Sequence, residues 1–154
     1  MTPELNMLQL SSAKQQLDQE MELLASSIQQ LQAAKSKYEE SEQCVIAQKN
    51  VSENNEILVP LTGSMYVIGK VKDADKFMVD IGAGYYVEKN GSNTVEYFKR
   101  KVKFLNEQIE KYTKLLQEKI QMRDSVLEAL QFRQQHLLAA NSTNLDPAKL
   151  AQKS

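Results

Sequence analysis

Two segments of the chain repeat apolar residues with the spacing of a coiled coil, and this pattern constrains the fold more than any other feature. In the first segment an apolar residue returns every seven positions over about five heptads, with further apolar residues four positions later. The members of this first seam are Leu10, Leu17, Met21, Leu24, Ile28, Leu31, Tyr38 and Val45. Such a repeat predicts a long helix, over about residues 5–50, that packs one face against another helix.

The second segment lies near the other end of the chain and keeps the same alternation of three and four residues. Its seam consists of Val95, Phe98, Val102, Leu105, Ile109, Tyr112, Leu116, Val126, Leu130 and Leu137. Six further seam positions carry charge, namely Lys14, Lys35, Glu42, Lys119, Arg123 and Arg133. Charged residues weaken a coiled-coil core but can fix its register. We therefore expect a second helix over about residues 92–140, followed by a flexible tail over residues 141–154.

The two helical segments carry opposite net charge. Residues 1–50 hold four basic and seven acidic groups, whereas residues 92–154 hold eleven and seven. The segments are similar in length and are separated by only about forty residues, and short connections favour antiparallel neighbours. The sequence therefore favours an intramolecular antiparallel helix pair within a single domain of residues 1–154. A parallel homodimer stays open as the alternative, because each segment could pair with its own copy.

The middle of the chain, residues 56–89, has the pattern of strands instead of helices. Four short runs, "ILVPL", "MYVIGKV", "FMVDI" and "YYVEK", are rich in β-branched and aromatic residues and are separated by Gly, Ser and Asp. They predict two β-hairpins. The Gly-Ala-Gly between the last two runs predicts a tight turn, because glycine tolerates positive φ. A phosphate-binding loop is disfavoured, since a strand and not a helix follows the glycines.

Four strands of about five residues are too few to enclose a core, and their edges leave backbone groups unpaired. We therefore predict an α+β protein whose sheet closes with the sheets of other subunits into an intersubunit β-barrel. The candidate residues for subunit assembly are Leu58, Val59, Met65, Val67, Val79, Ile81, Tyr85 and Val87. Replacement of Val79 or Ile81 by aspartate should prevent assembly, because an unpaired carboxylate buried in such a barrel is strongly unfavourable.

Four stretches together resemble one known family. "LVPLTGSMYVIGKV", "FMVDIGAGYYVEK" and "EYFKRKVKFL", with "KQQLDQEMELL" before them, are similar to the α-class subunits of prefoldin, and the likeness runs from about Leu10 to about Leu137. Two hairpins between the heptad segments mark the α class, whereas β-class subunits have one. The sequence departs from the family at Ile68, where proline is common.

The resemblance implies a heterohexameric co-chaperone of two α-class and four β-class subunits, joined through a double β-barrel from which six coiled coils project. It implies that the tips of the coiled coils hold unfolded polypeptides, chiefly actin and tubulin chains. These clients would pass to the cytosolic chaperonin without ATP hydrolysis. No cofactor, nucleic-acid partner or membrane partner is expected. Cytoplasmic localisation is expected, with the nucleus left open as a second compartment.

An antiparallel helix pair would bring the start of the first helix and the end of the second to one distal tip. The candidate client-binding residues there are Leu5, Met7, Leu8, Leu10, Leu137 and Leu138, with Leu145 and Leu150 further along the chain. From the pattern alone these residues either extend the seams or contact a partner, and the resemblance favours contact with clients. Leucine and methionine side chains adapt to varied apolar surfaces.

No group of residues has the spacing of a catalytic or metal site, so the chain is predicted not to be an enzyme. Cys44 and His136 each stand alone. The basic run from Lys99 to Lys103 is interpreted as a solvated face that pairs with the acidic first segment, with nucleic-acid binding as the alternative. The alternative function is a coiled-coil scaffold or adaptor, transcription-related in the nucleus, in which the sheet dimerises the chain.

The compartment is predicted from two further patterns. The first residues lack the basic and apolar regions of a secretory leader. No apolar run approaches the length of a membrane span. Both observations predict an intracellular protein.

Overall fold

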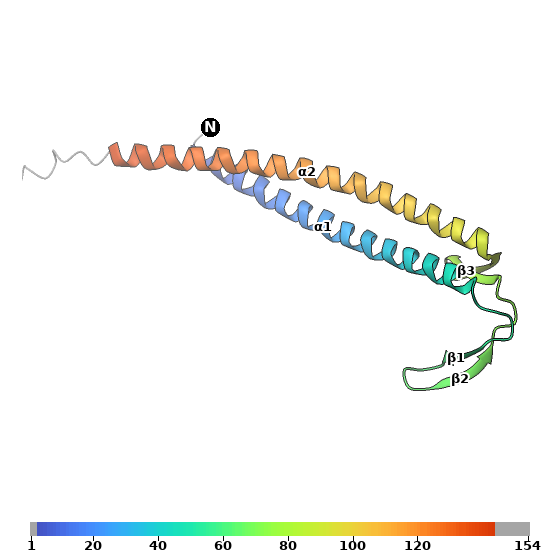
Figure 1. Cartoon of the computed structure of the whole chain (residues 1–154). Helices are drawn as coiled ribbons and strands as arrows, with labels where there is room; N and C mark the ends of the chain where they lie inside the picture. The colour runs from blue at the N-terminus through green and yellow to red at the C-terminus, as the bar shows by residue number, and fades with distance from the viewer. Residues whose placement is uncertain (1–2, 144–154) are drawn as a thin grey trace, which may run out of the picture. The chain divides into compact units, whose positions relative to one another are not determined.

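The computed structural model describes residues 3–143, and it describes side chains for residues 7–140. In chain order the elements are helix α1 (Pro3–Gln48), strands β1 (Glu56–Pro60), β2 (Tyr66–Lys70), β3 (Lys76–Gly82) and β4 (Tyr85–Asn90), and helix α2 (Gly91–Thr143) (Figure 1). The expected order of helix, two hairpins and helix is confirmed. Residues 144–154 of the predicted tail lie outside the described residues.

The chain forms two compact units, and both helices run through both of them. The helix-end unit comprises Met1–Ile28 with Lys111–Ser154, and the hairpin unit comprises Gln29–Glu110. All four strands belong to the hairpin unit. The predicted assembly residues therefore lie in the hairpin unit, and the predicted client-binding residues lie in the helix-end unit.

Composition explains why both helices run so far without a break. Within its bounds, α1 has no glycine or proline after Pro3, and α2 has none after Gly91. Proline is tolerated in a first turn, whereas in a helix interior glycine costs about 1 kcal/mol and proline about 3 kcal/mol. Over the described residues, neither helix contains a stretch that could cross a membrane.

The boundary between β4 and α2 is fixed by Asn90. Its side-chain Oδ1 accepts a hydrogen bond from the backbone N–H of Asn93 at 2.9 Å, and its carbonyl oxygen accepts one from the Thr94 hydroxyl at 2.7 Å. Asparagine is a preferred N-cap residue because its side chain satisfies a free N–H of the first helical turn. Helix α2 can therefore begin directly at the end of β4.

The hairpin unit contains a small core to which both helices and one strand contribute. Its buried side chains include Val45 of α1, Val79 of β3, and Thr94 and Leu105 of α2. Thr94 is a polar residue in this core, and its hydrogen bond to Asn90 satisfies its hydroxyl. The second hairpin is therefore part of the fold of the hairpin unit.

Contacts between the helices within each unit confirm the predicted antiparallel pair. In the helix-end unit, Lys119 Nζ lies 2.6 Å from Glu20 Oε2. In the hairpin unit, the centroids of the Tyr38 and Phe98 rings lie 6.1 Å apart. The contacting residues thus advance along α1 as they retreat along α2, which is the order that an antiparallel pair requires.

Burial along the helices follows the predicted seams with one exception. The seam residues of α1 are half-buried or buried, and so are those of α2 apart from Tyr112, whose side chain is exposed. The adjacent Thr113 is half-buried instead. An α-helix has 3.6 residues per turn, so a strict heptad pattern drifts around the helix and one seam position can turn outward.

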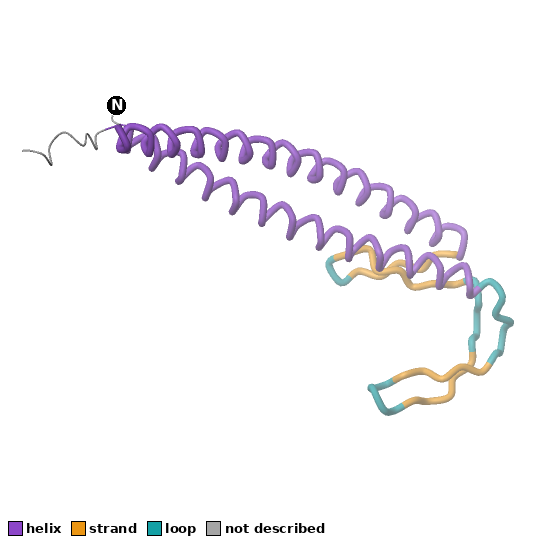
Figure 2. Tube along the Cα trace, turned by 60° about the vertical axis from the view of Figure 1, so that its left-hand side comes forward, coloured by secondary structure: helices purple, strands orange, loops and turns teal. Residues whose placement is uncertain are grey.

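The strands form two separate two-stranded antiparallel sheets (Figure 2). Strands β1 and β2 pair without a shift of register, and Ile68 lies opposite Leu58 within this regular ladder. Isoleucine at this position therefore continues the strand. Strands β3 and β4 pair with one shift, between Asp80 and Gly82.

Candidate subunit-assembly and client-contact surfaces

One face of the β3–β4 hairpin packs against the chain's own helices. Val79 of β3 is only 4% exposed. Together with Phe77 it borders a hollow of about 470 Å³ whose wall also includes Val45 of α1 and Phe98 of α2. Val87 lies opposite Val79 and so shares this face. Val79 therefore belongs to the core of its own chain, although the sequence pattern placed it among the residues for assembly.

The turn between β3 and β4 has the backbone conformation that Gly-Ala-Gly predicts. Gly82, Ala83 and Gly84 have φ angles of 111°, 52° and 78°. Asp80 Oδ1 accepts a hydrogen bond from the Gly82 N–H at 2.8 Å. Ile81 is the extra residue of a bulge just before the turn, and bulges increase the local twist of a strand. The glycines therefore serve the hairpin turn.

A side-chain hydrogen bond ties the β3–β4 hairpin to the first turn of α2. Asp75, just before β3, accepts this bond at Oδ1 from the buried N–H of Gly91 at 3.0 Å. A Cβ atom at residue 91 would lie 2.9 Å from that oxygen and 3.5 Å from Phe77 Cε2. Only glycine fits here without a local shift, and its small size lets the hairpin approach the helix closely.

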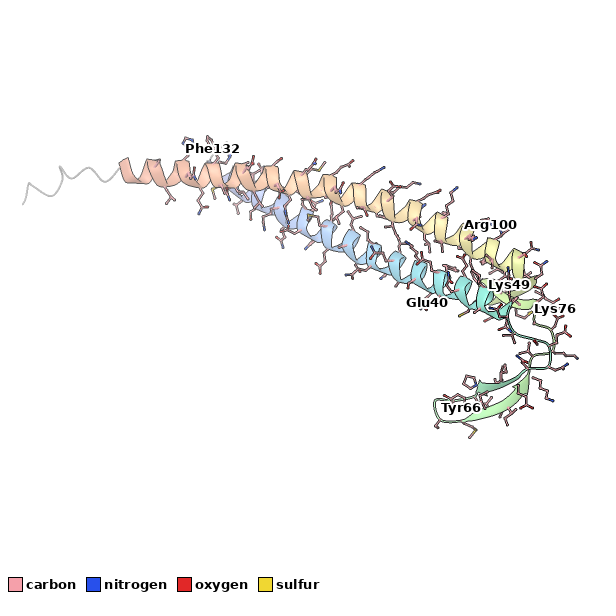
Figure 3. The ribbon with its side chains drawn as sticks, in the orientation of Figure 1. Glu40, Lys49, Tyr66, Lys76, Arg100 and Phe132 are labelled. Carbon is pink, nitrogen blue, oxygen red and sulfur yellow. The ribbon has the colours of Figure 1, made fainter. Side chains whose placement is uncertain are left out.

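The β1–β2 hairpin, in contrast, exposes both of its faces. All residues of these strands are exposed apart from Val59 and Gly69, which are half-buried. Val59 packs over Gly69, since a Cβ atom there would lie 3.1 Å from Val59 Cγ2. The exposed apolar side chains of the hairpin and its turn are Ile57, Leu58, Leu61, Met65, Tyr66, Val67 and Ile68 (Figure 3 labels Tyr66). An apolar cluster of this size on a surface indicates an interaction site.

The register distributes the predicted assembly residues over two faces of this hairpin. Leu58 lies opposite Ile68, and Val59 lies opposite Val67. Because successive residues of a strand point to opposite faces, these two pairs lie on different faces. The remaining predicted residues, Met65, Ile81, Tyr85 and Val87, are exposed. The role of the whole set in assembly stays a prediction.

Sequence reasoning missed several exposed apolar residues of the hairpins. They are Ile57, Leu61, Tyr66, Ile68, Met78 and Tyr86. Their residue types are typical of strands and can be read from the sequence. The register that pairs the strands cannot be read from the sequence, so the exposure of these side chains could not be predicted. A surface that uses both faces of β1–β2 therefore contains more residues than a one-faced pattern predicts.

The helix-end unit presents apolar side chains near the start of α1 and the end of α2. Leu8 and Leu138 are exposed, and Met7, Leu10 and Leu137 are half-buried. Leu5 lies in α1, but its side chain is outside the described part of the chain, and so are Leu145 and Leu150. The described candidates therefore combine residues that extend the seams with residues that face outward.

Phe132 is a further exposed apolar residue of the helix-end unit that sequence reasoning missed. Thirteen positions separate Met7 from Glu20, and thirteen separate Lys119 from Phe132. Because Glu20 contacts Lys119 and the helices are antiparallel, Phe132 lies level with Met7. Its side chain, labelled in Figure 3, is 63% exposed. The centroid of its ring lies 4.4 Å from that of the His136 ring. An aromatic residue outside the seam was the signal that could have identified it.

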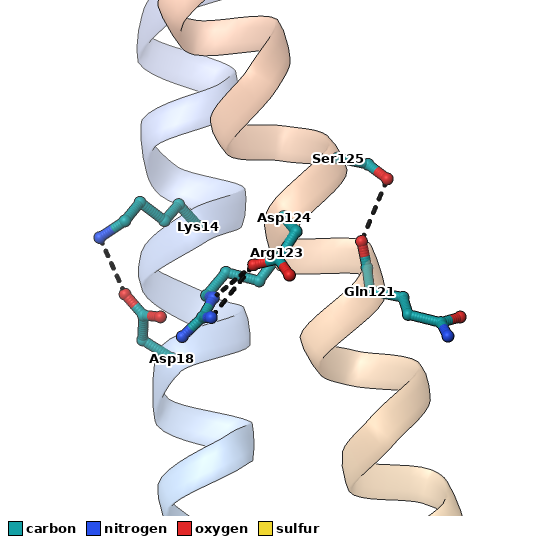
Figure 4. Close-up of polar contacts among 6 residues, drawn as sticks. All are labelled: Lys14, Asp18, Gln121, Arg123, Asp124 and Ser125. Atoms are coloured by element: carbon teal, nitrogen blue, oxygen red, sulfur yellow. Dashed lines mark hydrogen bonds and ion pairs between the residues drawn. The ribbon is translucent and has the colours of Figure 1, made fainter.

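An ion pair joins the two helices of the helix-end unit and has a clear electrostatic effect. The pKa of the Glu20 carboxyl is lowered below its ordinary value, chiefly by the hydrogen bond from Lys119. A hydrogen bond from Gln16 and the positive charge of Lys119 lower it further. The contacts drawn in Figure 4 each join residues of one helix: Lys14 with Asp18, Arg123 with Asp124, and the Ser125 hydroxyl with the Gln121 carbonyl. Of the ion pairs named in this paragraph, only Lys119 with Glu20 joins α1 to α2.

The described residues carry exposed apolar surfaces and no cluster of metal-ligating side chains. Among them, no group of three or more His, Cys, Asp or Glu side chains could hold a metal ion. Cys44 is exposed and borders the hollow between α1 and β3. The surfaces that stand out are the apolar β1–β2 hairpin and the apolar residues of the helix-end unit.

Comparisons with known proteins agree with this geometry. A family model described as Prefoldin subunit matches residues 17–136. Prefoldin subunit 5 of Homo sapiens is 46% identical over 136 residues, which cover 88% of this chain and 88% of the relative. Probable prefoldin subunit 5 of Drosophila melanogaster is 41% identical over 126 residues, which cover 82% of this chain and 75% of the relative.

A solved structure has the same fold. It is described as a cryo-EM structure of filamentous PFD from Methanocaldococcus jannaschii, and it aligns with a TM-score of 0.67 at 20% sequence identity. The alignment covers 76% of this chain and 97% of that chain. At this identity the likeness concerns the fold alone. Because the family model matches more than half of the chain and the relatives cover most of it, the chain belongs to the prefoldin family of co-chaperone subunits.

Proposed function

We propose that this chain is an α-class subunit of a prefoldin heterohexamer, assembled with one further α-class and four β-class subunits. Its hairpins form part of a double β-barrel, and its helix pair holds unfolded polypeptides. Actin and tubulin chains are the proposed clients, and the cytosolic chaperonin is the proposed acceptor. The function requires no catalytic group, nucleotide or cofactor, and it takes place in the cytoplasm.

The β1–β2 hairpin is the observation that carries the proposal for assembly. Ile68 is 73% exposed, and Leu58 opposite it is exposed as well. Among the described residues, neither strand has a second neighbouring strand. A two-stranded sheet with apolar faces and open edges is marginally stable in water and is stabilised by contact with other strands.

Replacement of Ile68 by aspartate tests the assembly surface. The side chain is exposed in the single chain, so the variant should fold, but a carboxylate buried in a barrel would cost several kcal/mol. We expect the variant, mixed with β-class prefoldin subunits, to form no hexamer by light scattering. Leu23→Asp is the matched control, because Leu23 is 70% exposed on α1 and should allow normal assembly. A normal hexamer mass for Ile68→Asp would contradict the proposal.

Client contact is proposed for the apolar residues of the helix-end unit. Leu8 and Phe132 are exposed, and they belong to different helices of that unit. Each surface is small, so a single helix pair would bind an unfolded chain weakly. Several helix pairs on one assembly would bind the same chain with higher avidity. Release then needs only a competing acceptor.

A double substitution, Leu8→Ser with Phe132→Ser, tests this surface without shortening the helices. Hexamers that contain it should protect denatured actin from aggregation less well than the parent. The control is Met122→Ser, an exposed apolar residue of the same unit, which should leave protection unchanged. Removal of residues 1–10 and 138–154 should abolish protection and preserve assembly. Equal protection by trimmed and intact hexamers would contradict the assignment.

The same reconstitution distinguishes this function from a scaffold. A prefoldin α-class subunit should require β-class partners to reach its full mass. A stable homodimer of this chain that does not bind β-class subunits would contradict the proposed hexamer and favour a dimeric scaffold.

A further inference from the structure

A group of cationic and aromatic side chains lies at the start of α2, outside the seam. We call it the basic patch, and it consists of Lys89 of β4 with Tyr97, Arg100, Lys101 and Phe104 of α2. Lys89 Nζ and Lys101 Nζ lie 5.8 and 5.6 Å from the centroid of the Tyr97 ring. Both distances are within the range of cation–π attraction. Two elements of the hairpin unit thus bring positive charge to a single ring.

The basic patch surrounds a hollow of about 320 Å³ that is lined by Tyr97, Arg100, Lys101 and Phe104. The Tyr97 ring makes an edge contact with the Phe98 ring of the seam, at 5.6 Å between centroids. Phe104 is 55% exposed, and Arg100 is exposed and projects from α2 in Figure 3. The hollow therefore offers apolar contacts and two cationic side chains, Arg100 and Lys101, to the same ligand.

The cations of the basic patch form no ion pair with a carboxylate of the described residues. The sequence predicted that the basic run from Lys99 to Lys103 would pair with the acidic first helix, and Lys99 Nζ does lie 4.0 Å from Glu42 Oε1. No carboxylate of a described residue, however, forms an ion pair with Lys89, Arg100 or Lys101. The pairing prediction is thus confirmed at one position, and the patch beside it keeps its charge available for a ligand.

The size and borders of the basic patch favour an acidic peptide over a nucleic acid. Glu96 lies one turn before Arg100, and Glu107 lies one turn after Phe104, so carboxylates border the cations on both sides along the helix. The cationic run from residue 99 to 103 rises only about 6 Å along the helix axis. Nucleic-acid binding draws its affinity from many phosphate contacts, and so short a run would reach few of them.

We propose that the basic patch binds an acidic linear segment of a partner protein. Arg100, Lys101 and Lys89 contact carboxylates of that segment, and Phe104 contacts an apolar side chain between them. Charge complementarity indicates an anionic partner, because charge-assisted hydrogen bonds to carboxylates are among the strongest contacts that Arg and Lys side chains make. This binding goes beyond subunit assembly and client contact, and its residues are not those of either proposed surface.

The test uses the full chain in its assembly with β-class subunits. The probe is a short fluorescein-labelled peptide of glutamates around one phenylalanine, and its binding is followed by fluorescence anisotropy. We expect saturable binding that weakens as salt is added. Arg100→Glu with Lys101→Glu should weaken binding at least about tenfold, because two contacts change from attraction to repulsion. Arg100→Gln with Lys101→Gln should weaken binding less, and circular dichroism should show unchanged helicity for both variants.

The matched control reverses two exposed charges elsewhere, in Lys49→Glu with Lys111→Glu, and should bind like the parent. Phe104→Ala should weaken binding about fivefold through lost apolar contact. A peptide in which glutamine replaces glutamate should not bind. The proposal is overturned if the acidic peptide fails to bind, or if the Arg100 and Lys101 variants bind it normally. Tighter binding of a single-stranded oligonucleotide than of the peptide also overturns it, since the ligand would then be a nucleic acid.

Discussion

The two hairpins of this chain have the same antiparallel topology but differ in what covers them. β3–β4 buries Val79 in the core of the hairpin unit, and Asp75 ties it to α2 through Gly91. β1–β2 leaves Leu58 and Ile68 exposed on one face and Val67 on the other. One hairpin therefore completes the fold of its own chain, and the other exposes the apolar side chains on which its proposed role in assembly rests.

Connections to the helices explain the difference. β4 leads directly into α2, because Asn90 is both the last residue of the strand and the N-cap of the helix. β1 and β2 are instead joined to the rest by residues 49–55 and 71–75. Hydrogen bonds from the Asn54 N–H to the Val71 carbonyl at 2.7 Å and from the Val71 N–H to the Asn55 carbonyl at 3.0 Å extend the first ladder. The hydrogen bonds at the base of the β1–β2 hairpin thus join its own two connecting segments to each other, and the hairpin has less contact with the helices than β3–β4 has.

Val79→Asp should give the largest difference between the hairpins. The new carboxylate would be buried without a partner, so we expect the isolated chain to lose at least about 3 kcal/mol of unfolding free energy. Ile68→Asp should change that free energy by less than about 0.5 kcal/mol, because the residue is exposed. Urea unfolding of the isolated chain measures both values. Equal unfolding free energies for the two variants would contradict the claim that β3–β4 is packed on its own helices and β1–β2 is exposed.

Gly91→Ala should have the next largest effect. The added Cβ would lie 2.9 Å from Asp75 Oδ1, so the hairpin must move away from α2, and we expect a loss of about 1–3 kcal/mol. Gly63→Ala, in the turn of the open hairpin, is the control. Apart from residue 63 and its two chain neighbours, no described residue has an atom within 4 Å of the Cβ that it would add, and the change should be neutral or slightly stabilising. A Gly91→Ala chain as stable as the parent would show that this close approach is not needed.

Asn90→Ala removes the cap that joins the covered hairpin to α2. The Asn93 N–H would lose its side-chain acceptor, and we expect a loss of about 1 kcal/mol. Asn93→Ala keeps the backbone donor and the cap, so it should be close to neutral. Thermal unfolding followed by circular dichroism measures both variants. A larger loss for Asn93→Ala than for Asn90→Ala would contradict the capping geometry.

The smallest effect concerns Glu20, which serves as a reference because it belongs to the helix-end unit. Its pKa is lowered, chiefly by the hydrogen bond from Lys119, so folding favours the ionised carboxyl. The resulting stability is present above the ordinary pKa of about 4.5 and is lost as pH falls through the lowered value. Between neutral and acidic pH, the parent should therefore lose slightly more stability than Glu20→Gln. Parallel urea midpoints for the two chains across this range would show that the pair contributes nothing.

Much of the fold could be predicted from the sequence because it depends on local periodicity. The heptads of Leu10 to Val45 and the Gly-Ala-Gly turn each specify an element through residues that are near one another in the chain. The assembly surface could be predicted only as a region. Whether Val79 faces its own helices or another subunit depends on strand register and on the close packing at Gly91, and neither is a local property.

The helix ends show the same limit. Leu8 and Leu138 were predicted because they lie near the ends of the heptad segments. Phe132 was missed because it stands outside the seam, and its position level with Met7 follows only from the register of the helix pair. The basic run from Lys99 to Lys103 was interpreted as a solvated face. The basic patch was not predicted, because Lys89 of a strand and Lys101 of a helix both approach Tyr97, and that depends on the fold.

Hydrogen exchange of the two hairpins, in the isolated monomer and in the complex with β-class subunits, tests the central claim most directly. The backbone N–H groups of β3 and β4 should already be protected in the monomer, because the hairpin is packed on its own helices. Those of β1 and β2 should exchange fast in the monomer and become protected only in the complex. Equal protection of both hairpins in the monomer, with no change on assembly, would contradict the account.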